Sequence, residues 1–185
     1  GSSGVPSGPS HAATVRTLMM RIETCEIIQE KRDALRELSQ VPDVGRFMTP
    51  DQVVSLVLTG KHYVGDDWEI ARTVVEILAT ATDPTSHGGN ESHHEGLLAV
   101  MVDVPFFLSF LEDNHFWSKY HCVQILQRIE ETNPSAVHKQ LLAVHGVHTV
   151  IDVLNDSSNG GILRNEGLIL LTSLTATDQE LQTIV

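Results

Sequence analysis

The sequence contains little cysteine and few aromatic residues. Its only two cysteines, Cys25 and Cys122, lie far apart in 185 residues, and both fall within helical patterns. This excludes a disulfide framework and favours reduced, buried thiols of a cytosolic protein over metal ligands or a nucleophile. Aromatic residues make up 5% of the chain, while hydrophobic residues make up 41%. The core must therefore consist mainly of Leu, Ile, Val and Ala, which suits packed helices better than a β-sandwich.

Basic residues are scarce relative to acidic ones. The chain has 12 Lys and Arg against 24 Asp and Glu, which gives a net charge of −12. Such a chain repels phosphate backbones and anionic lipid, so we do not expect nucleic acid as a partner. The charged segment "EKRDALRE" mixes both signs, as a solvated helix face does.

A signal peptide and a long apolar run are also missing. The opening "GSSGVPSGPSHAA" is rich in Gly, Ser and Pro and has no apolar centre. We expect residues 1–12 to be a tag remnant and a disordered tail. The most apolar stretch, residues 97–111, is interrupted by Asp103 and Pro105 and is too short to span a bilayer.

Helical periodicity dominates the rest of the chain. Apolar residues recur at i, i+3, i+4 and i+7 in the first predicted helix: Val15, Leu18, Met19 and Ile22. Thr49, Pro50 and Gln52 predict a capping box at the start of another helix. Alternating strand patterns flanked by hairpin signals are absent. The sequence predicts an all-α domain over residues 13–185, with a flexible, histidine-bearing loop over about residues 83–96.

The predicted helices repeat. The segments "FLSFLED" and "SKYHCVQILQRI" have the same design as "VIDVLND" and "LRNEGLILLTSL". Leu111 corresponds to Leu154, a step of 43, and Leu126 corresponds to Leu171, a step of 45. Such periods are typical of armadillo and HEAT arrays, whereas an irregular helical bundle predicts no internal alignment. We therefore predict an armadillo-like, right-handed superhelix of about three repeats, forming the amino-terminal part of a longer array.

Aligning the three longest helices separates a predicted core from a predicted binding surface. The expected core positions are Val75, Val123, Leu168, Leu78, Leu126 and Leu171. The opposite stripe is mostly polar and forms the predicted protein-binding groove: Arg72, Glu76, Tyr120, Gln124, Gln127, Asn165 and Thr172. An idle, solvated helix face is the alternative interpretation of this stripe.

Ten histidines raise the question of a metal site. His87, His93, His94 and Glu95 lie in one predicted loop, but this spacing defines no tetrahedral zinc site and has no cysteine nearby. The sequence also lacks a Gly-x-Ser-x-Gly elbow, a phosphate-binding loop and a His-Glu-x-x-His helix. We predict no catalytic residue, no metal and no cofactor.

Two tryptophans, Trp68 and Trp117, suggest a ladder of Trp and Asn that binds extended basic peptides. Such a ladder requires Asn four residues after each Trp, where this chain has Arg72 and His121. Partial packing of both tryptophans in the core between repeats is therefore the favoured interpretation.

Three segments resemble the globular head of the general vesicular transport factor family, which are long golgins that tether vesicles at the Golgi. They are "TVRTLMMRIETCEIIQEKRDALRELSQ", "FLSFLEDNHFWSKYHCVQILQRI" and "GILRNEGLILLTSLTATDQELQTIV". These segments keep the family's order and spacing and cover somewhat under half of the chain. The resemblance is weaker between residues 41 and 96.

The resemblance implies a non-enzymatic tether that acts in transport from the endoplasmic reticulum to the Golgi and within the Golgi. It implies Rab-type GTPases, SNARE proteins and other Golgi tethers as partners. It also implies a cytoplasmic protein that is peripheral on Golgi and vesicle membranes and dimerises through a coiled coil. We expect the present fragment to be monomeric. The alternative is an armadillo-type peptide-binding adaptor, such as a fragment of a nuclear-import receptor.

The carboxyl-terminal helices carry many apolar residues. We expect several of them to face a missing next repeat in part: Ile162, Leu168, Leu171, Leu174, Leu181, Ile184 and Val185. They would form an exposed apolar patch larger than a monomer usually shows. Such a patch would be an effect of truncation rather than a natural partner site.

Overall fold

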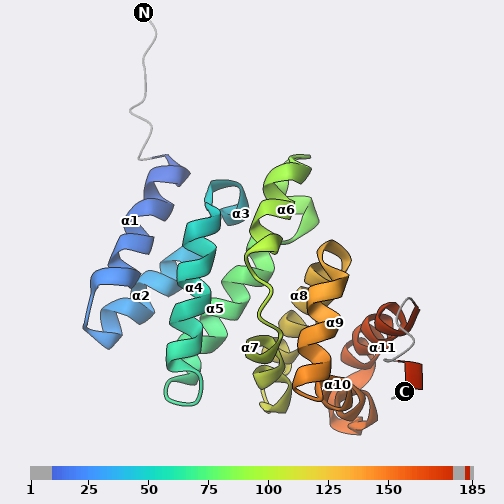
Figure 1. Ribbon diagram of the computed structural model, residues 1–185. Helices are drawn as coiled ribbons and strands as arrows, with labels where there is room; N and C mark the ends of the chain where they lie inside the picture. Colours follow the sequence, from blue (N-terminus) through green and yellow to red (C-terminus); the bar gives the residue numbers. More distant parts are fainter. Residues whose placement is uncertain (1–9, 177–181, 184–185) are drawn as a thin grey trace, which may run out of the picture. The chain divides into compact units, whose positions relative to one another are not determined.

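The computed structural model describes residues 10–176 and 182–183 (Figure 1). In this part of the chain every regular element is a helix or a 3₁₀ turn, and no strand is present. The predicted all-α fold class is therefore confirmed. The chain divides into two compact units between Asn90 and Glu91.

From residue 10 onward, the first unit contains five α-helices and one 3₁₀ turn: α1 (His11–Thr24), α2 (Ile28–Ser39), α3 (Val44–Phe47), α4 (Pro50–Tyr63), α5 (Trp68–Ala81) and η1 (Pro84–His87). Helix α1 packs against α2, and both α2 and α4 pack against α5. Helix α1 begins two residues before the predicted boundary at residue 13. The earlier start has a local cause, because the Ser10 side chain accepts a hydrogen bond from the Ala13 amide at 3.2 Å.

Among its described residues, the second unit contains six α-helices and two 3₁₀ turns: α6 (Glu91–Ala99), α7 (Val104–Ser109), η2 (Phe110–Glu112), α8 (Phe116–Thr132), α9 (Pro134–Ala143), α10 (Gly146–Asn155), η3 (Ser157–Asn159) and α11 (Gly160–Ala176). Helix α8 packs against α6, α7, α9 and α11, so it lies at the centre of the unit. Helix α11 packs against both α8 and α10.

The predicted capping box at the start of α4 is confirmed. The Thr49 hydroxyl accepts a hydrogen bond from the Gln52 amide at 3.2 Å, and the Gln52 side chain accepts one from the Thr49 amide at 3.0 Å. These bonds satisfy two backbone donors that would otherwise have no partner at a helix start. Pro50 fits the first helical position because it has no amide hydrogen to satisfy.

The histidine-bearing segment over residues 83–96, which we predict to be a flexible loop, is instead mostly helical. It contains η1 and the first part of α6. His87 is buried, and its Nε2 lies 2.6 Å from the carbonyl oxygen of Ala81. Leu97 and Leu98, at the end of α6, are also buried. Burial of these apolar residues favours a helix in spite of the polar composition that precedes them.

A close backbone approach joins α3 to the end of α5. A Cβ atom at Gly45 would lie 2.1 Å from the carbonyl oxygen of Ala81, so only glycine permits this packing. The same carbonyl oxygen also contacts His87, and α3, α5 and η1 are therefore tied together at one point.

Five of the six predicted core positions are buried: Val75, Leu78, Val123, Leu126 and Leu171. The sixth prediction is wrong, because Leu168 is 55% exposed. Val123 is the residue of α8 that corresponds to Leu168. It lies between Lys119 and Gln127, whose side chains bond to Asn159 and Glu166. Among the described residues, no helix packs in the same way on the corresponding face of α11.

The predicted carboxyl-terminal patch is confirmed only in part. Ile162 and Leu168 are exposed, as expected, but Leu171 and Leu174 are buried. The last two residues face inward, where α11 packs against α8 and α10. The other predicted members, Leu181, Ile184 and Val185, lie outside the described residues.

Candidate protein-binding surface

Helices α8 and α11 lie side by side in the second unit. The ammonium group of Lys119 donates to Asn159 Oδ1 at 2.9 Å, just before α11 begins. One helical turn from the middle of α8, Gln127 Nε2 donates to the backbone oxygen of Glu166 at 2.8 Å and to its carboxylate at 2.9 Å. The two bonds join residues 40 and 39 positions apart, so the helices run in the same direction with a nearly constant offset.

Three residues of the predicted groove lie on α8. Tyr120 and Gln124 are half-buried, and Gln124 Nε2 donates to the Tyr120 hydroxyl oxygen at 2.9 Å. The side-chain amide of Gln127 donates its hydrogen bonds to Glu166. The stripe on α8 is therefore an ordered polar surface, in which Gln127 joins the two helices.

Two predicted groove residues, Asn165 and Thr172, lie on α11 and are exposed. The Thr172 hydroxyl donates to the backbone oxygen of Leu168 at 2.8 Å, so this hydroxyl is hydrogen-bonded within its own helix. Asn165 lines an open cavity of about 400 Å³. The other lining residues are Leu154, Asn155, Gly161, Arg164 and Leu168.

The remaining predicted groove residues, Arg72 and Glu76, lie on α5 of the first unit. The Arg72 guanidinium lies 5.8 Å from the centre of the Trp68 ring, in a cation–π contact, and Glu76 is exposed. The structure thus brings five of the seven predicted residues together on α8 and α11. Arg72 and Glu76 form a separate pair one helical turn apart.

Trp117 is less buried than we expect from the predicted partial packing of both tryptophans in the core between repeats. It is 58% exposed, whereas Trp68 is half-buried. The Trp117 ring contacts three neighbours on α8: Phe116 at 5.1 Å, Tyr120 at 5.9 Å and His121 at 6.3 Å between ring centres. The repeat step of 45 matches Trp117 to Ile162, which is also exposed.

Within residues 10–176 and 182–183, no group of three His, Cys, Asp or Glu side chains is placed to hold a metal ion. Burial raises the pKa of the Cys122 thiol, and the hydrogen bond to Glu30 raises the pKa of Cys25. Both thiols are therefore protonated at neutral pH, and a protonated thiol is a poor nucleophile.

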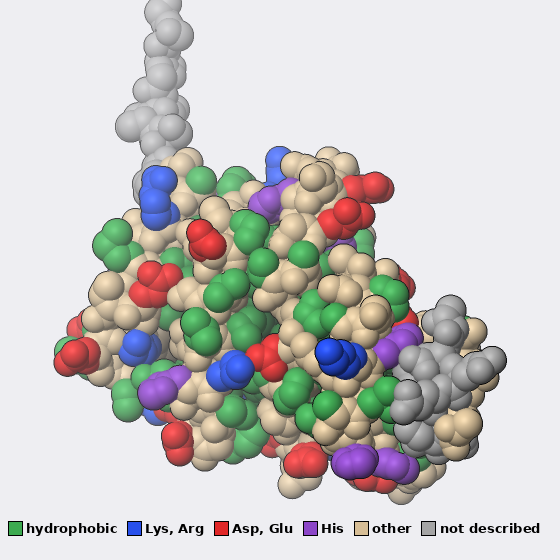
Figure 2. Space-filling model, viewed as in Figure 1, with side chains coloured by type: hydrophobic (Ala, Val, Ile, Leu, Met, Phe, Trp, Pro, Cys, Tyr) green, Lys and Arg blue, Asp and Glu red, His purple; other side chains and the backbone are tan. Residues whose placement is uncertain are grey.

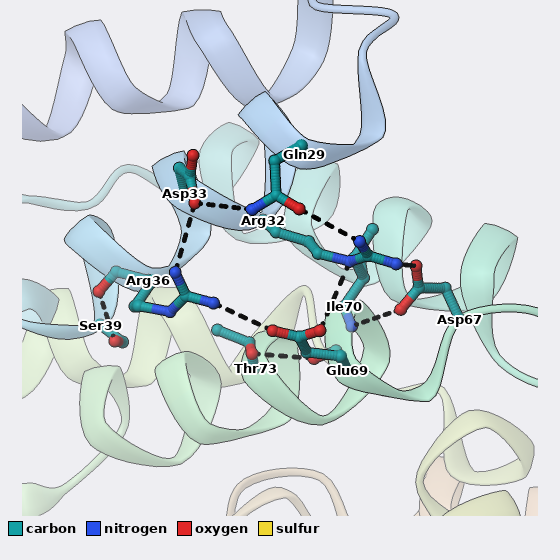
Figure 3. A network of polar contacts seen from close by, with 9 residues as sticks. All are labelled: Gln29, Arg32, Asp33, Arg36, Ser39, Asp67, Glu69, Ile70 and Thr73. Carbon is teal, nitrogen blue, oxygen red and sulfur yellow. Dashed lines mark hydrogen bonds and ion pairs between the residues drawn. The ribbon is translucent and has the colours of Figure 1, made fainter.

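A network of ion pairs joins α2 to the start of α5 in the first unit (Figure 3). Arg32 pairs with Asp67 at 2.6 Å, and Arg36 pairs with Glu69 at 3.0 Å. Asp67 also caps α5 by accepting from the Ile70 amide at 3.2 Å. Burial alone would raise the pKa of Asp67, but the hydrogen bonds from Ile70 and Arg32 outweigh it and lower the pKa. This network joins α2 to the start of α5 within the first unit.

The scarcity of Lys and Arg in the composition is also visible on the surface. On the face shown in Figure 2, Lys and Arg side chains lie singly among hydrophobic, acidic and other polar groups. Among the described residues no single helix is long and apolar enough to cross a membrane. The pair Glu91–Ala99 and Val104–Glu112, bent by 78°, meets that test by length and composition only.

Comparison with known proteins gives relatives along most of the chain, although no family model matches it. Golgin candidate 6 of Arabidopsis thaliana is 29% identical over 65% of this chain and 14% of its own length. General vesicular transport factor p115 is 24% identical over 98% of this chain and 20% of its own length, in both Homo sapiens and Bos taurus. The chain spans a fifth or less of the length of these curated relatives. At this modest identity, the chain is a homologue of the general vesicular transport factors, as its three quoted segments predict.

Proposed function

We propose that the chain is part of a vesicle-tethering protein that acts in transport from the endoplasmic reticulum to the Golgi and within the Golgi. The observation that carries this proposal is the similarity to general vesicular transport factor p115 over 98% of the chain. The name of Golgin candidate 6, a plant relative, supports the same cellular setting.

In this proposal the helical repeats act as a scaffold that binds proteins and catalyses no reaction. The all-helical fold and the parallel, similarly designed helices α8 and α11 support an armadillo-like, right-handed array. The protonated state of both thiols is consistent with a non-enzymatic role. The polar stripe on α8 and α11 supplies the surface for partners.

The proposed partners are Rab-type GTPases, SNARE proteins and other Golgi tethers. The protein would be cytoplasmic and would reach Golgi and vesicle membranes through these partners. Its full-length form would be a homodimer joined by a coiled coil, with the present residues monomeric. The acidic charge of −12 supports protein partners over direct contact with anionic lipid.

The test is a binding assay with the purified chain and purified Rab-type GTPases, each loaded with GTP or GDP. We expect at least one GTPase to bind in its GTP form. The double variant Asn165→Ala, Thr172→Ala should weaken this binding, because both side chains are exposed on α11. Lys139→Ala, an exposed change on α9, is the matched control. Absence of binding by every GTPase, SNARE protein and Golgi tether tested would contradict the scaffold proposal.

The exposure of Trp117 favours a second candidate, an armadillo-type peptide-binding adaptor. An adaptor of the nuclear-import kind would bind a fluorescent basic peptide at micromolar concentration or below. His121 stands where such a ladder has Asn, and Arg72 stands at the equivalent place after Trp68. Failure of the basic peptide to bind would remove this candidate and leave the tether.

A further inference from the structure

The dipeptide Asn159–Gly160 lies where η3 ends and α11 begins. In such a dipeptide the backbone nitrogen of the glycine can attack the side-chain amide carbon of the asparagine, because glycine has no side chain to obstruct the approach. Each of the other asparagines is followed by a residue with a side chain: Asn90, Asn114, Asn133, Asn155 and Asn165. Asn159 is therefore the asparagine of this chain whose sequence most favours loss of the side-chain amide.

The backbone requires the glycine of this dipeptide. Gly160 has a φ of +73°, a conformation that favours glycine, although a Cβ atom at this position would have open space. Backbone geometry, rather than lack of space, thus keeps a glycine beside Asn159. The turn itself produces the reactive dipeptide, so its protection has to come from the surrounding structure.

The Asn159 side chain is held at both ends of its amide. Its Oδ1 accepts from the ammonium group of Lys119 on α8 at 2.9 Å, and its Nδ2 donates to the backbone oxygen of Val153 on α10 at 3.2 Å. Asn159 is 5% exposed and Lys119 is 6% exposed. Rotation of the amide would break both bonds and leave buried polar groups without these partners, which costs free energy.

The backbone conformation of Asn159 also opposes the reaction. Asn159 is the last residue of η3, and its amide donates to the backbone oxygen of Asp156 at 3.2 Å. In a 3₁₀ conformation the peptide bond that follows is not aligned with the asparagine side chain. Because ring closure needs the Gly160 nitrogen beside Asn159 Cγ, η3 has to open first.

The reaction consumes only water. The Gly160 nitrogen forms a bond to Asn159 Cγ, the bond from Cγ to Nδ2 breaks, and Nδ2 leaves as ammonia with the proton that the Gly160 nitrogen gives up. Water then opens the cyclic imide at either carbonyl. Opening at Cγ yields aspartate. Opening at the backbone carbonyl yields isoaspartate, in which the main chain runs through the side chain.

We propose that Asn159 is a modification site at which the fold controls deamidation. The reaction is slow while Lys119 and Val153 hold the amide, and local opening of η3 permits it. Isoaspartate lengthens the main chain directly before α11 and removes the amide that bonds to Lys119. The modified chain thus loses a link between α8 and α11 beside the candidate protein-binding surface. This inference goes beyond the tether proposal and does not depend on it.

Peptide mapping by mass spectrometry measures deamidation while the purified chain is incubated at mildly alkaline pH. In guanidinium chloride that unfolds the chain, Asn159 should lose its amide faster than Asn165, an exposed asparagine followed by Glu166. Without denaturant, the rate at Asn159 should fall at least about tenfold, because ring closure then requires loss of a hydrogen bond to a charged group. Equal rates in the folded and unfolded chain, or no reaction at Asn159 in the unfolded chain, would overturn the proposal.

The variant Lys119→Met tests the local hold on the amide. It keeps a long side chain and removes the hydrogen-bond donor. In the folded chain it should speed deamidation at Asn159 by about tenfold. Lys139→Met, an exposed change on α9, is the matched control and should leave the rate unchanged.

A further variant separates the local hold from overall stability. Leu126→Ala truncates a buried core residue of the same unit and leaves Lys119 and Asn159 in place. Lys119→Met and Leu126→Ala are compared at denaturant concentrations at which equal fractions of each are folded. Deamidation should remain faster in Lys119→Met, and equal rates would overturn the proposal. The comparison of the folded and unfolded chain uses no variant, so it is decisive whether or not Lys119→Met folds.

Discussion

The leucines Leu126 and Leu168 have the same side chain in helices of similar design, but they differ in burial. Leu126 is 1% exposed within the second unit, whereas more than half of Leu168 is exposed. The free energy gained by burying a leucine comes from removing its surface from water and from close packing. The difference between the same truncation at the two positions therefore measures the free energy gained by burial.

We expect Leu126→Ala to lower the free energy of unfolding by about 2–5 kcal/mol, because it leaves a cavity in a packed core. Leu168→Ala should change it by less than about 0.5 kcal/mol, as exposed substitutions usually do. Chemical denaturation followed by circular dichroism measures both values. A large loss at Leu168, or none at Leu126, would show that the residue register of the second unit is wrong.

At the scale of elements, the carboxylate of Asp67 makes two contacts at the junction between α2 and α5. Asp67 caps α5 and also pairs with Arg32 of α2, so it supports both the start of one helix and its packing on another (Figure 3). Asp66, its neighbour, is exposed and precedes the cap. The two residues allow a matched comparison at adjacent positions.

We expect Asp67→Ala to reduce stability by roughly 0.5–2 kcal/mol at neutral pH through loss of the cap, and Asp66→Ala to have little effect. The folded-state pKa of Asp67 lies below its ordinary value of 3.8. Its contribution is therefore complete above that value and is lost as the pH falls through the lower, folded-state pKa. Thermal melts of both variants across acidic pH measure this. A stability difference between Asp67→Ala and the unchanged chain that persists at the lowest pH would contradict the prediction.

At the scale of the whole molecule, the corresponding faces of α8 and α11 have different neighbours among the described residues. Val123 and Lys119 are buried on the face of α8 toward η3 and α11, and the equivalent Leu168 and Arg164 on α11 are exposed. In a repeat array, the next unit normally covers each such face. The interface formed in this way stabilises the preceding unit.

We therefore expect a longer chain that carries a further repeat after α11 to melt at a higher temperature than the present 185 residues. Differential scanning calorimetry of the two chains makes the comparison, and hydrogen exchange locates the change. Amides of α11 should gain protection in the longer chain, while those of α4 serve as the internal control. Equal melting temperatures, with α11 already as protected as α8, would disprove the account of an uncovered face.

The sequence by itself determined the fold class, the capping box at Thr49 and most of the core. Helical periodicity and local capping depend on residues only a few positions apart, so the one-dimensional pattern contains them. Only the tertiary structure decided the exposure of Leu168 and Trp117 and the helical state of residues 91–96. Those outcomes depend on which face of a helix has a neighbour, and that neighbour comes from distant parts of the chain. For the same reason, only the tertiary structure shows that the Gln127 side chain bonds to α11 and that the Asn165 side chain is exposed.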